Sequence, residues 1–118
     1  MSRPIILYGI PNCDQVKKAR AWLAAQSIDY VFQDFKKGVA SRTAIEEWLT
    51  IIPMDKLINR KGTTWRGLTD VQRASASDVD GAIELMIQHP SLIKRPIFRS
   101  DEVILAGFDP DAYRTALE

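Results

Sequence analysis

The stretch that decides the fold is Ile5-Ile6-Leu7-Tyr8-Gly9-Ile10-Pro11-Asn12-Cys13, at residues 5–13. Its apolar run ends at Gly9, a pattern typical of a buried strand followed by a tight loop. A helical pattern then runs from Asp14 to about Gln26, and residues 28–32 are rich in strand-forming side chains. Strand, helix and strand in this order predict a right-handed parallel crossover unit. The buried face of the predicted helix consists of Val16, Ala19 and Leu23.

The middle of the chain is predicted to be helical. Ser41 is a suitable cap for one helix, which Pro53 ends. A turn-rich stretch follows at residues 59–64, and a second helix begins after Ser77 and ends before Pro90. The apolar stripe of the first helix is Ile45, Trp48, Leu49 and Ile52, and that of the second is Val79, Ala82, Ile83 and Met86.

The last third of the chain returns to strands. Residues 95–98 and 103–105 are two short candidates, and the polar residues between them suit a hairpin. Asp109 and Pro110 then provide the cap and the first position of a final helix. A hydrophobic staple is predicted between Phe108 and Tyr113.

This order of elements predicts an α/β protein. The chain alternates βαβ, helices and ββα, which corresponds to a thioredoxin-like fold with an inserted helical subdomain at about residues 38–90. Its four strands would form one mixed sheet with outer helices. The length of 118 residues suits a single domain spanning residues 1–118.

Composition restricts the partners and the compartment. A net charge of +1 gives no electrostatic reason to expect nucleic acid or a membrane surface as a partner. No apolar run approaches the ~20 residues that span a bilayer, and the first residues do not resemble a signal peptide. We therefore expect a cytoplasmic monomer. One cysteine and one histidine exclude an intramolecular disulfide and a zinc site of several cysteines, so no metal is expected.

Cys13 is the residue whose side chain is the strongest candidate for a chemical reaction. It lies between the first strand and the first helix, where free N–H groups and the helix dipole stabilise a thiolate. Lys17, one turn further on, would add a positive charge, whereas Asp14 would oppose it. The expected result is a lowered thiol pKa. The alternative is that Cys13 is only a small buried apolar residue.

Two arginines could complete a site with Cys13. Arg95 precedes Pro96 at the start of the third strand, and a cis bond there would place the backbone beside the cysteine loop. Arg60 lies in the turn after Ile58 and could equally face solvent. Together with the helix N-terminus, the two guanidinium groups would bind an oxyanion or a carboxylate.

Four segments of the chain, in this order, carry a resemblance to a known family. They are Tyr8-Gly9-Ile10-Pro11-Asn12-Cys13-Asp14-Gln15-Val16-Lys17-Lys18-Ala19, Leu57-Ile58-Asn59-Arg60-Lys61-Gly62-Thr63-Thr64-Trp65, Pro90-Ser91-Leu92-Ile93-Lys94-Arg95-Pro96-Ile97 and Ala106-Gly107-Phe108. On these segments the chain resembles the arsenate reductase (ArsC)/Spx family and, more narrowly, its YffB-type branch. The resemblance implies a thioredoxin-like fold and a cis peptide at Arg95-Pro96. It also implies that Cys13 is the nucleophile, that Arg60 and Arg95 are catalytic, and that Asn12, Arg60, Arg95 and Pro96 bind substrate or glutathione.

Two departures from the family pattern affect the functional hypothesis. Gly107 stands where glutathione-dependent arsenate reductases have a third arginine, and Val16 stands where Spx-type regulators often have a second cysteine. The leading hypothesis is a glutathione-dependent thiol oxidoreductase that has no bound cofactor. Glutathione would be its co-substrate, and a disulfide or an oxyanion its substrate. The alternatives are a glutathione-coupled arsenate reductase and a non-catalytic, Spx-like adaptor that docks on RNA polymerase or another protein.

Overall fold

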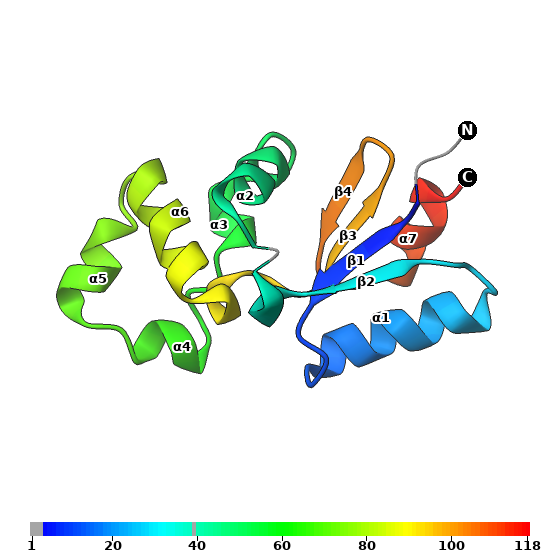
Figure 1. Ribbon diagram of the computed structural model, residues 1–118, viewed down its shortest axis with the longest axis horizontal. Helices are drawn as coiled ribbons and strands as arrows, with labels where there is room; N and C mark the ends of the chain where they lie inside the picture. The colour runs from blue at the N-terminus through cyan, green and yellow to red at the C-terminus, as the bar shows by residue number, and fades with distance from the viewer. Residues whose placement is uncertain (1–3, 39) are drawn as a thin grey trace. The chain divides into compact units, whose positions relative to one another are not determined.

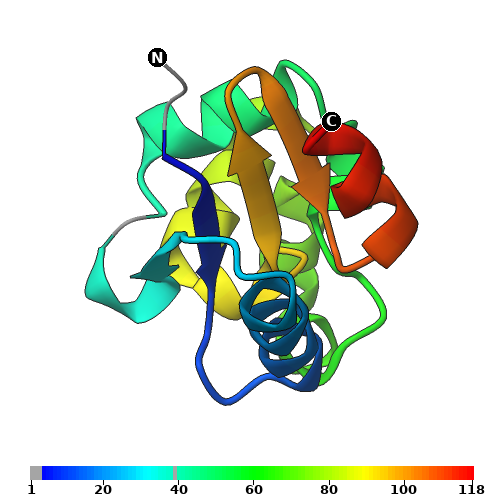
Figure 2. The same cartoon turned by 90° about the vertical axis from the view of Figure 1, so that its right-hand side faces the viewer.

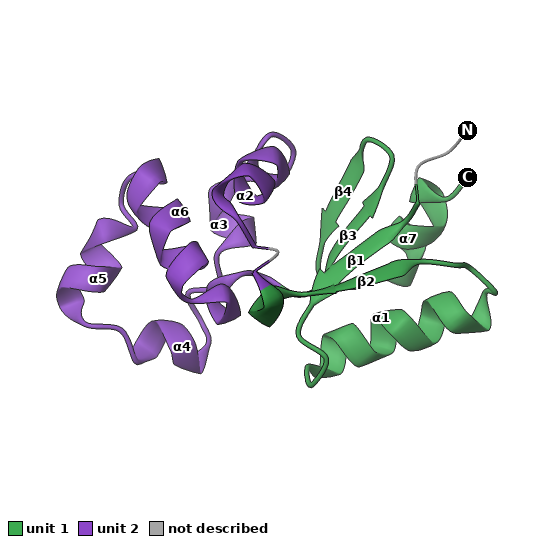
Figure 3. Cartoon of the chain, viewed as in Figure 1, with its two compact units in different colours: residues 1–37, 95–118 green, residues 38–94 purple. Residues whose placement is uncertain are grey.

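The chain forms two compact units (Figure 3). The computed structural model describes residues 4–38 and 40–118. The first unit contains both ends of the chain, up to Lys37 and from Arg95, and the second contains Gly38–Lys94. The predicted helical insertion, at about residues 38–90, falls within the second unit.

The first unit is built on a four-stranded mixed sheet (Figure 1). The strands lie in the order β2-β1-β3-β4. β1 pairs with β2 in parallel and with β3 antiparallel, and β3 and β4 form the predicted hairpin. This is the thioredoxin-like arrangement expected from the order of elements. The strands are β1 (Ile6–Gly9), β2 (Val31–Asp34), β3 (Ile97–Ser100) and β4 (Val103–Ala106).

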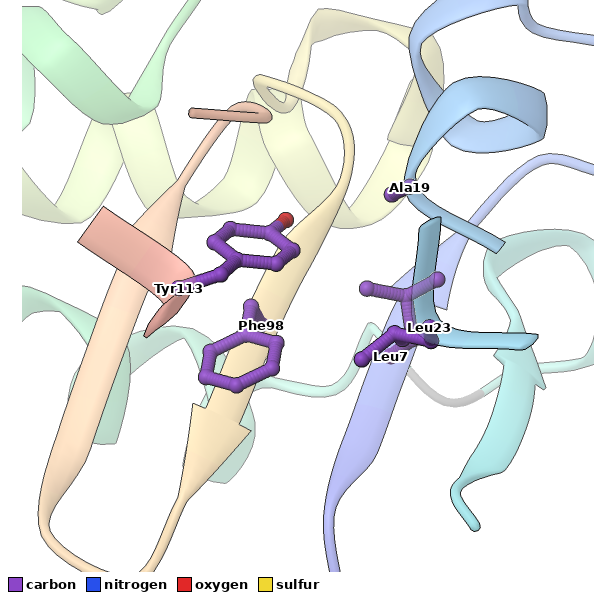
Figure 4. Packing of buried hydrophobic residues seen from close by; sticks show 5 residues of the cluster. All are labelled: Leu7, Ala19, Leu23, Phe98 and Tyr113. Carbon is purple, nitrogen blue, oxygen red and sulfur yellow. The ribbon is translucent and has the colours of Figure 1, made fainter. Parts of the chain in front are cut away.

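Two helices cover one face of this sheet, α1 (Asp14–Ala25) and α7 (Pro110–Ala116) (Figure 2). Leu7 is paired with Phe98 across the two central strands, and both are fully buried. The Tyr113 ring stacks on Phe98 with 4.2 Å between centroids (Figure 4). This apolar layer supplies the hydrophobic stabilisation of the unit. A short 3₁₀ helix, η1 (Phe35–Lys37), follows β2.

The start of α7 is tied to the start of β3. Asp109 caps the helix, and Phe108 meets Tyr113 edge to face, which confirms the predicted staple. The Tyr113 hydroxyl donates to the carbonyl of Gly107, and the Gly107 N–H donates to the carbonyl of Pro96, each at 2.7 Å. Gly107 has a φ of 91°, a conformation that favours glycine.

The second unit is helical. Its core contains large buried side chains from several of its helices, including Ile45, Trp48, Leu57 and Met86. Ser41 caps the first helix as predicted, because its hydroxyl accepts from the N–H of Ala44. No described helix of the chain is both long and apolar enough to span a bilayer. The helices are α2 (Arg42–Leu49), α3 (Met54–Leu57), α4 (Thr63–Arg66), α5 (Asp70–Ser75), α6 (Val79–Gln88) and η2 (Pro90–Leu92).

Several local predictions differ from the structure. β2 begins at Val31 rather than at residue 28, because the chain first turns through Ser27, whose φ is 57°. Val79 is 60% exposed and does not belong to the buried stripe of α6. Val79 is the first residue of α6. The close contact between α5 and α6 lies at Gly81, two residues further on, so it does not cover Val79. Helix α5 itself was not predicted.

Gly81 is required for the packing of α5 on α6. A Cβ atom at this position would collide with the carbonyl of Ser75, a backbone group that cannot rotate away. We expect Gly81→Ala to lower the free energy of unfolding by about 1–3 kcal/mol, the usual cost of overpacking, although alanine favours helices. Urea denaturation measures this change.

Gly67→Ala is the matched control. Gly67 has φ −79° and ψ −7°, and an added Cβ would approach the Thr63 carbonyl only to 3.4 Å. Its free energy of unfolding should stay within about 1 kcal/mol of the parent protein. Equal effects of the two substitutions would contradict the packing assigned to Gly81.

Candidate functional site

Cys13 occupies the N-cap of α1. Its backbone is extended, and its carbonyl accepts the first helical hydrogen bond, from the N–H of Lys17 at 2.9 Å. Gly9 makes the close approach of strand and helix possible, since a Cβ there would lie 2.7 Å from a methyl group of Val16. The thiol is partly buried and remains accessible. The turn from β1 into α1 therefore places the sulfur at the helix N-terminus.

Strand pairing brings Arg95 to the same end of the sheet. Because β3 runs antiparallel to β1, its first residue, Ile97, pairs with Tyr8 near the end of β1. Arg95 and Pro96 immediately precede that pair, and their peptide bond is cis, as the family resemblance implied. The Arg95 guanidinium donates a hydrogen bond to the Cys13 sulfur. The structure thus brings Cys13 and Arg95 together.

The pKa of the Cys13 thiol lies below its ordinary value. Burial alone would raise this pKa. The N–H groups of Val16 and Gln15 and the hydrogen bond and charge of Arg95 lower it, and together they outweigh burial. The Cys13 side chain makes no cap hydrogen bond of standard geometry, so we attribute the effect of the two N–H groups to the positive end of the helix. The lowered pKa agrees with the direction expected from the sequence.

The source of the lowered pKa differs in part from the prediction. Lys17 was expected to act on the thiol, but its side chain is exposed, and the cation that stabilises the thiolate is Arg95. The N–H groups of Gln15 and Val16 were not singled out from the sequence. They belong to the second and third positions of α1, where N–H groups face the cap residue. A cysteine at an N-cap is the signal that would have identified them.

The other predicted residues of this site differ in exposure. Asn12 precedes Cys13 and is exposed, so it is available to a ligand. Pro96 is buried, and its carbonyl is engaged by Gly107. Among residues 4–38 and 40–118, no three side chains of the metal-binding types gather into a group that could hold an ion.

Arg60 belongs to the second unit. It lies exposed in the turn between α3 and α4, and its guanidinium carbon is 5.6 Å from the centre of the Trp65 ring. The turn is anchored by an isolated bridge between Ile58 and Ile93. A role of Arg60 toward Cys13 stays a prediction.

A thioredoxin-like fold with a single cysteine at the N-cap of its first helix defines the class of this protein. The profile of the ArsC family matches residues 8–116, and the chain belongs to that family.

The chain is similar to several proteins whose names differ. The chain is similar to the solved structure of a protein named YFFB, with 41% identity, a TM-score of 0.88 and coverage of 97% of this chain and 99% of that one. An arsenate reductase-related protein from Brucella melitensis has 39% identity and a TM-score of 0.74, with 100% and 98% coverage. The global transcriptional regulator Spx of Streptococcus pyogenes is 28% identical over 96% of this chain and 84% of its own length.

The contribution of Arg95 to the thiolate is testable. We expect Arg95→Gln to raise the thiol pKa, because it removes both a hydrogen bond to the sulfur and a positive charge. The rate of alkylation of Cys13 by iodoacetamide, followed against pH, should then have its midpoint at higher pH, with slower reaction at neutral pH. Lys17→Gln removes an exposed cation from the same helix and should leave the midpoint unchanged. A larger shift for Lys17→Gln than for Arg95→Gln would contradict this assignment.

Proposed function

We propose that the protein is a glutathione-dependent thiol oxidoreductase that acts through Cys13. The observation that carries the proposal is the contact of the Cys13 sulfur with the Arg95 guanidinium at the N-terminus of α1. A partly accessible thiol with a lowered pKa is a nucleophile at neutral pH, whereas a buried structural cysteine is inert. Because the chain has only one cysteine, the reaction needs a second, external thiol.

The proposed reaction consists of two exchanges. The Cys13 thiolate attacks one sulfur of a substrate disulfide, so that a new S–S bond forms and the other substrate sulfur leaves as a thiolate that takes up a proton. The thiolate of glutathione then attacks the sulfur that the substrate contributed to this mixed disulfide and releases Cys13 as a thiolate. The substrate disulfide and one glutathione thus give one free thiol and one glutathione mixed disulfide. One substrate sulfur is thereby reduced to a thiol while the glutathione sulfur is oxidised to the disulfide level, and Arg95 stabilises the Cys13 thiolate whenever it leaves.

Glutathione fits this site by charge. Its two carboxylates are suitable partners for guanidinium groups, and the family resemblance assigns this role to Arg95 and Arg60. Exposed Asn12 and the backbone before β3 at Pro96 would align the peptide with the sulfur. No bound cofactor is required. We further propose that the protein is a cytoplasmic monomer that binds neither nucleic acid nor membranes.

Arsenate is a less favourable substrate for this site. The family resemblance assigns a third oxyanion-binding arginine to position 107, and here Gly107 has a φ of 91° and donates to Pro96. A side chain at that φ is strained, so the position suits glycine rather than arginine. Without a third cation, the charge that develops on arsenic is less well stabilised.

An adaptor role is the second candidate, and the likeness to Spx supports it. Such a protein would dock on RNA polymerase or another protein and would need no reactive thiol. Val16 argues against a redox switch of the Spx type, because the chain has no second cysteine with which Cys13 could pair. The two candidates therefore differ in whether Cys13 is required.

Mass spectrometry of the folded protein after exposure to oxidised glutathione tests the proposal. We expect an adduct of one glutathione on Cys13 that forms readily at neutral pH and is released by reduced glutathione. Cys13→Ser should form no adduct. Reaction only after unfolding would mean a buried, inert thiol and would overturn the enzymatic proposal.

Turnover separates the enzyme from the adaptor. With hydroxyethyl disulfide and reduced glutathione as substrates, we expect Cys13→Ala to lose turnover over the uncatalysed rate. A wild-type rate no higher than that of Cys13→Ala, together with an unchanged complex with a protein partner, would favour the adaptor.

A further inference from the structure

The turn that carries Arg60 is held in place by its backbone and by Asn59. The Asn59 N–H donates to the carbonyl of Leu92 at 2.7 Å, and the Asn59 side chain accepts from the N–H of Lys61 at 3.0 Å. An added Cβ at Gly62 would come within 2.9 Å of the same side chain. The backbone on both sides of Arg60 is therefore fixed, while the Arg60 side chain itself is exposed.

Trp65 supplies the contact that restrains the Arg60 side chain. The guanidinium carbon lies 5.6 Å from the centre of the ring, within the range of a cation–π contact. A long exposed arginine otherwise samples many rotamers, and ordering it on binding costs free energy. Stacking on an aromatic ring leaves the edge of the guanidinium free to donate hydrogen bonds to a planar anion.

Arg73 in turn fixes the helix that carries Trp65. One nitrogen of its guanidinium donates to the carbonyl of Leu68 at 2.6 Å and lies 3.4 Å and 3.3 Å from the carbonyls of Trp65 and Arg66. These carbonyls belong to the end of the four-residue helix α4 and the turn after it, and the Trp65 carbonyl also accepts from the N–H of Leu68. A cation at a helix C-terminus also interacts favourably with the dipole.

Arg73 is itself well anchored. It lies on α5, whose start has a capping box in which Thr69 and Gln72 bond each other's backbone N–H. Asp70 accepts a further hydrogen bond from its guanidinium. The side chain is thus directed at the end of α4 rather than free in solvent.

We propose that Trp65 and Arg73 are positioning residues that hold the Arg60 guanidinium ready for a carboxylate of glutathione. This inference rests on the proposed function, which makes Arg60 a carboxylate partner. Arg73 fixes α4, α4 fixes the Trp65 ring, and the ring orders the Arg60 side chain before the anion arrives. Loss of either residue weakens the binding of glutathione and leaves the chemistry of Cys13 unchanged.

A comparison of two thiols as co-substrates tests the positioning role of Trp65 and Arg73. Turnover of hydroxyethyl disulfide is measured with glutathione, which has carboxylates, and with 1-thioglycerol, which has none, by chromatography of the mixed disulfide that forms. We expect Trp65→Leu and Arg73→Gln to raise the KM for glutathione about threefold, the size of a cation–π contact at a partly exposed site, with kcat unchanged. Both constants for 1-thioglycerol should stay the same. Trp65→Phe and Arg73→Lys should recover part of the loss.

Binding without chemistry provides an independent measurement. S-methylglutathione has the same carboxylates but no free thiol, and its dissociation constant is measured by NMR titration of the full chain. We expect Trp65→Leu to raise this constant about threefold in the parent protein and not at all in an Arg60→Gln background, because Trp65 acts only through Arg60.

Arg114→Gln is the matched control. Arg114 also pairs with an aspartate three residues earlier, Asp111, and also lies over a tryptophan, Trp22, at 5.9 Å. Trp22 is nine residues along α1 from Cys13, a rise of about 13 Å. This substitution should change neither the KM for glutathione nor the binding of S-methylglutathione.

The outcomes separate this inference from the proposed function. Absence of Cys13-dependent turnover with either thiol overturns the proposed function. Normal turnover with an unchanged KM for glutathione in Trp65→Leu, or an equal loss with both thiols, overturns the positioning role alone. An effect of Trp65→Leu on S-methylglutathione binding that persists without Arg60 also overturns it. Urea denaturation of each variant establishes that it is folded under the assay conditions.

Discussion

The pairing of β1 with β3 is the interaction on which the candidate site depends. β1 lies between β2 and β3, so its backbone groups are paired on both sides. The antiparallel register that joins Tyr8 with Ile97 brings two segments more than eighty residues apart in sequence to one end of the sheet. One of them leads into Cys13 and the other begins with Arg95. A shift of this register by one residue would move both the core side chains and the arginine to the wrong face.

The chemistry of the site results from a balance between burial and nearby positive charge. Burial of the thiol opposes ionisation, and the N–H groups at the start of α1 together with Arg95 favour it. Burial is the largest single contribution, but the favourable contributions together outweigh it, so the sulfur is partly protected from solvent and still ionises easily. Gly9 is part of this balance, because the close packing of Val16 against the end of β1 would be blocked by a side chain there.

The two candidate arginines are held by different physical means. Arg95 is placed by strand pairing, next to a Pro96 whose carbonyl is bonded by Gly107. Arg60 is placed by a turn and by stacking on Trp65, with Arg73 behind the helix that carries the ring. An arginine that is already ordered loses less freedom when it binds an anion. Both arrangements are therefore suited to recognising a carboxylate.

Much of the first unit could be predicted from local sequence patterns. The face of α1, the capped start of α7 and the β3–β4 hairpin each depend on neighbouring residues, and all three are confirmed. The proximity of Arg95 to Cys13 depends on strand order, which local periodicity does not contain. The sequence suggested it only through a cis bond at Arg95-Pro96, and the family resemblance supplied that cis bond.

The second unit shows where pattern reading fails. Helix α5 has no apolar stripe to detect, since none of its described residues is buried and Val71 is 80% exposed. Its only sequence signal is the capping box formed by Thr69 and Gln72, which was overlooked. Val79 was assigned to the core because it has the right spacing, but spacing alone does not reveal where the neighbouring helix ends. The turn-rich segment at Arg60 likewise gave no indication of the Arg73 contacts behind it.

The most direct test of this account is the ionisation of Cys13 in the wild-type protein, followed by thiolate absorbance at ~240 nm in the folded chain and again in concentrated urea. With a single cysteine, the thiol signal belongs to one residue. The account predicts a midpoint at lower pH in the folded protein than in the unfolded chain, because only folding brings the N-terminus of α1 and Arg95 to the sulfur. A folded midpoint equal to or above the unfolded one would mean that burial outweighs these groups, and would contradict the central claim that Cys13 is an activated nucleophile.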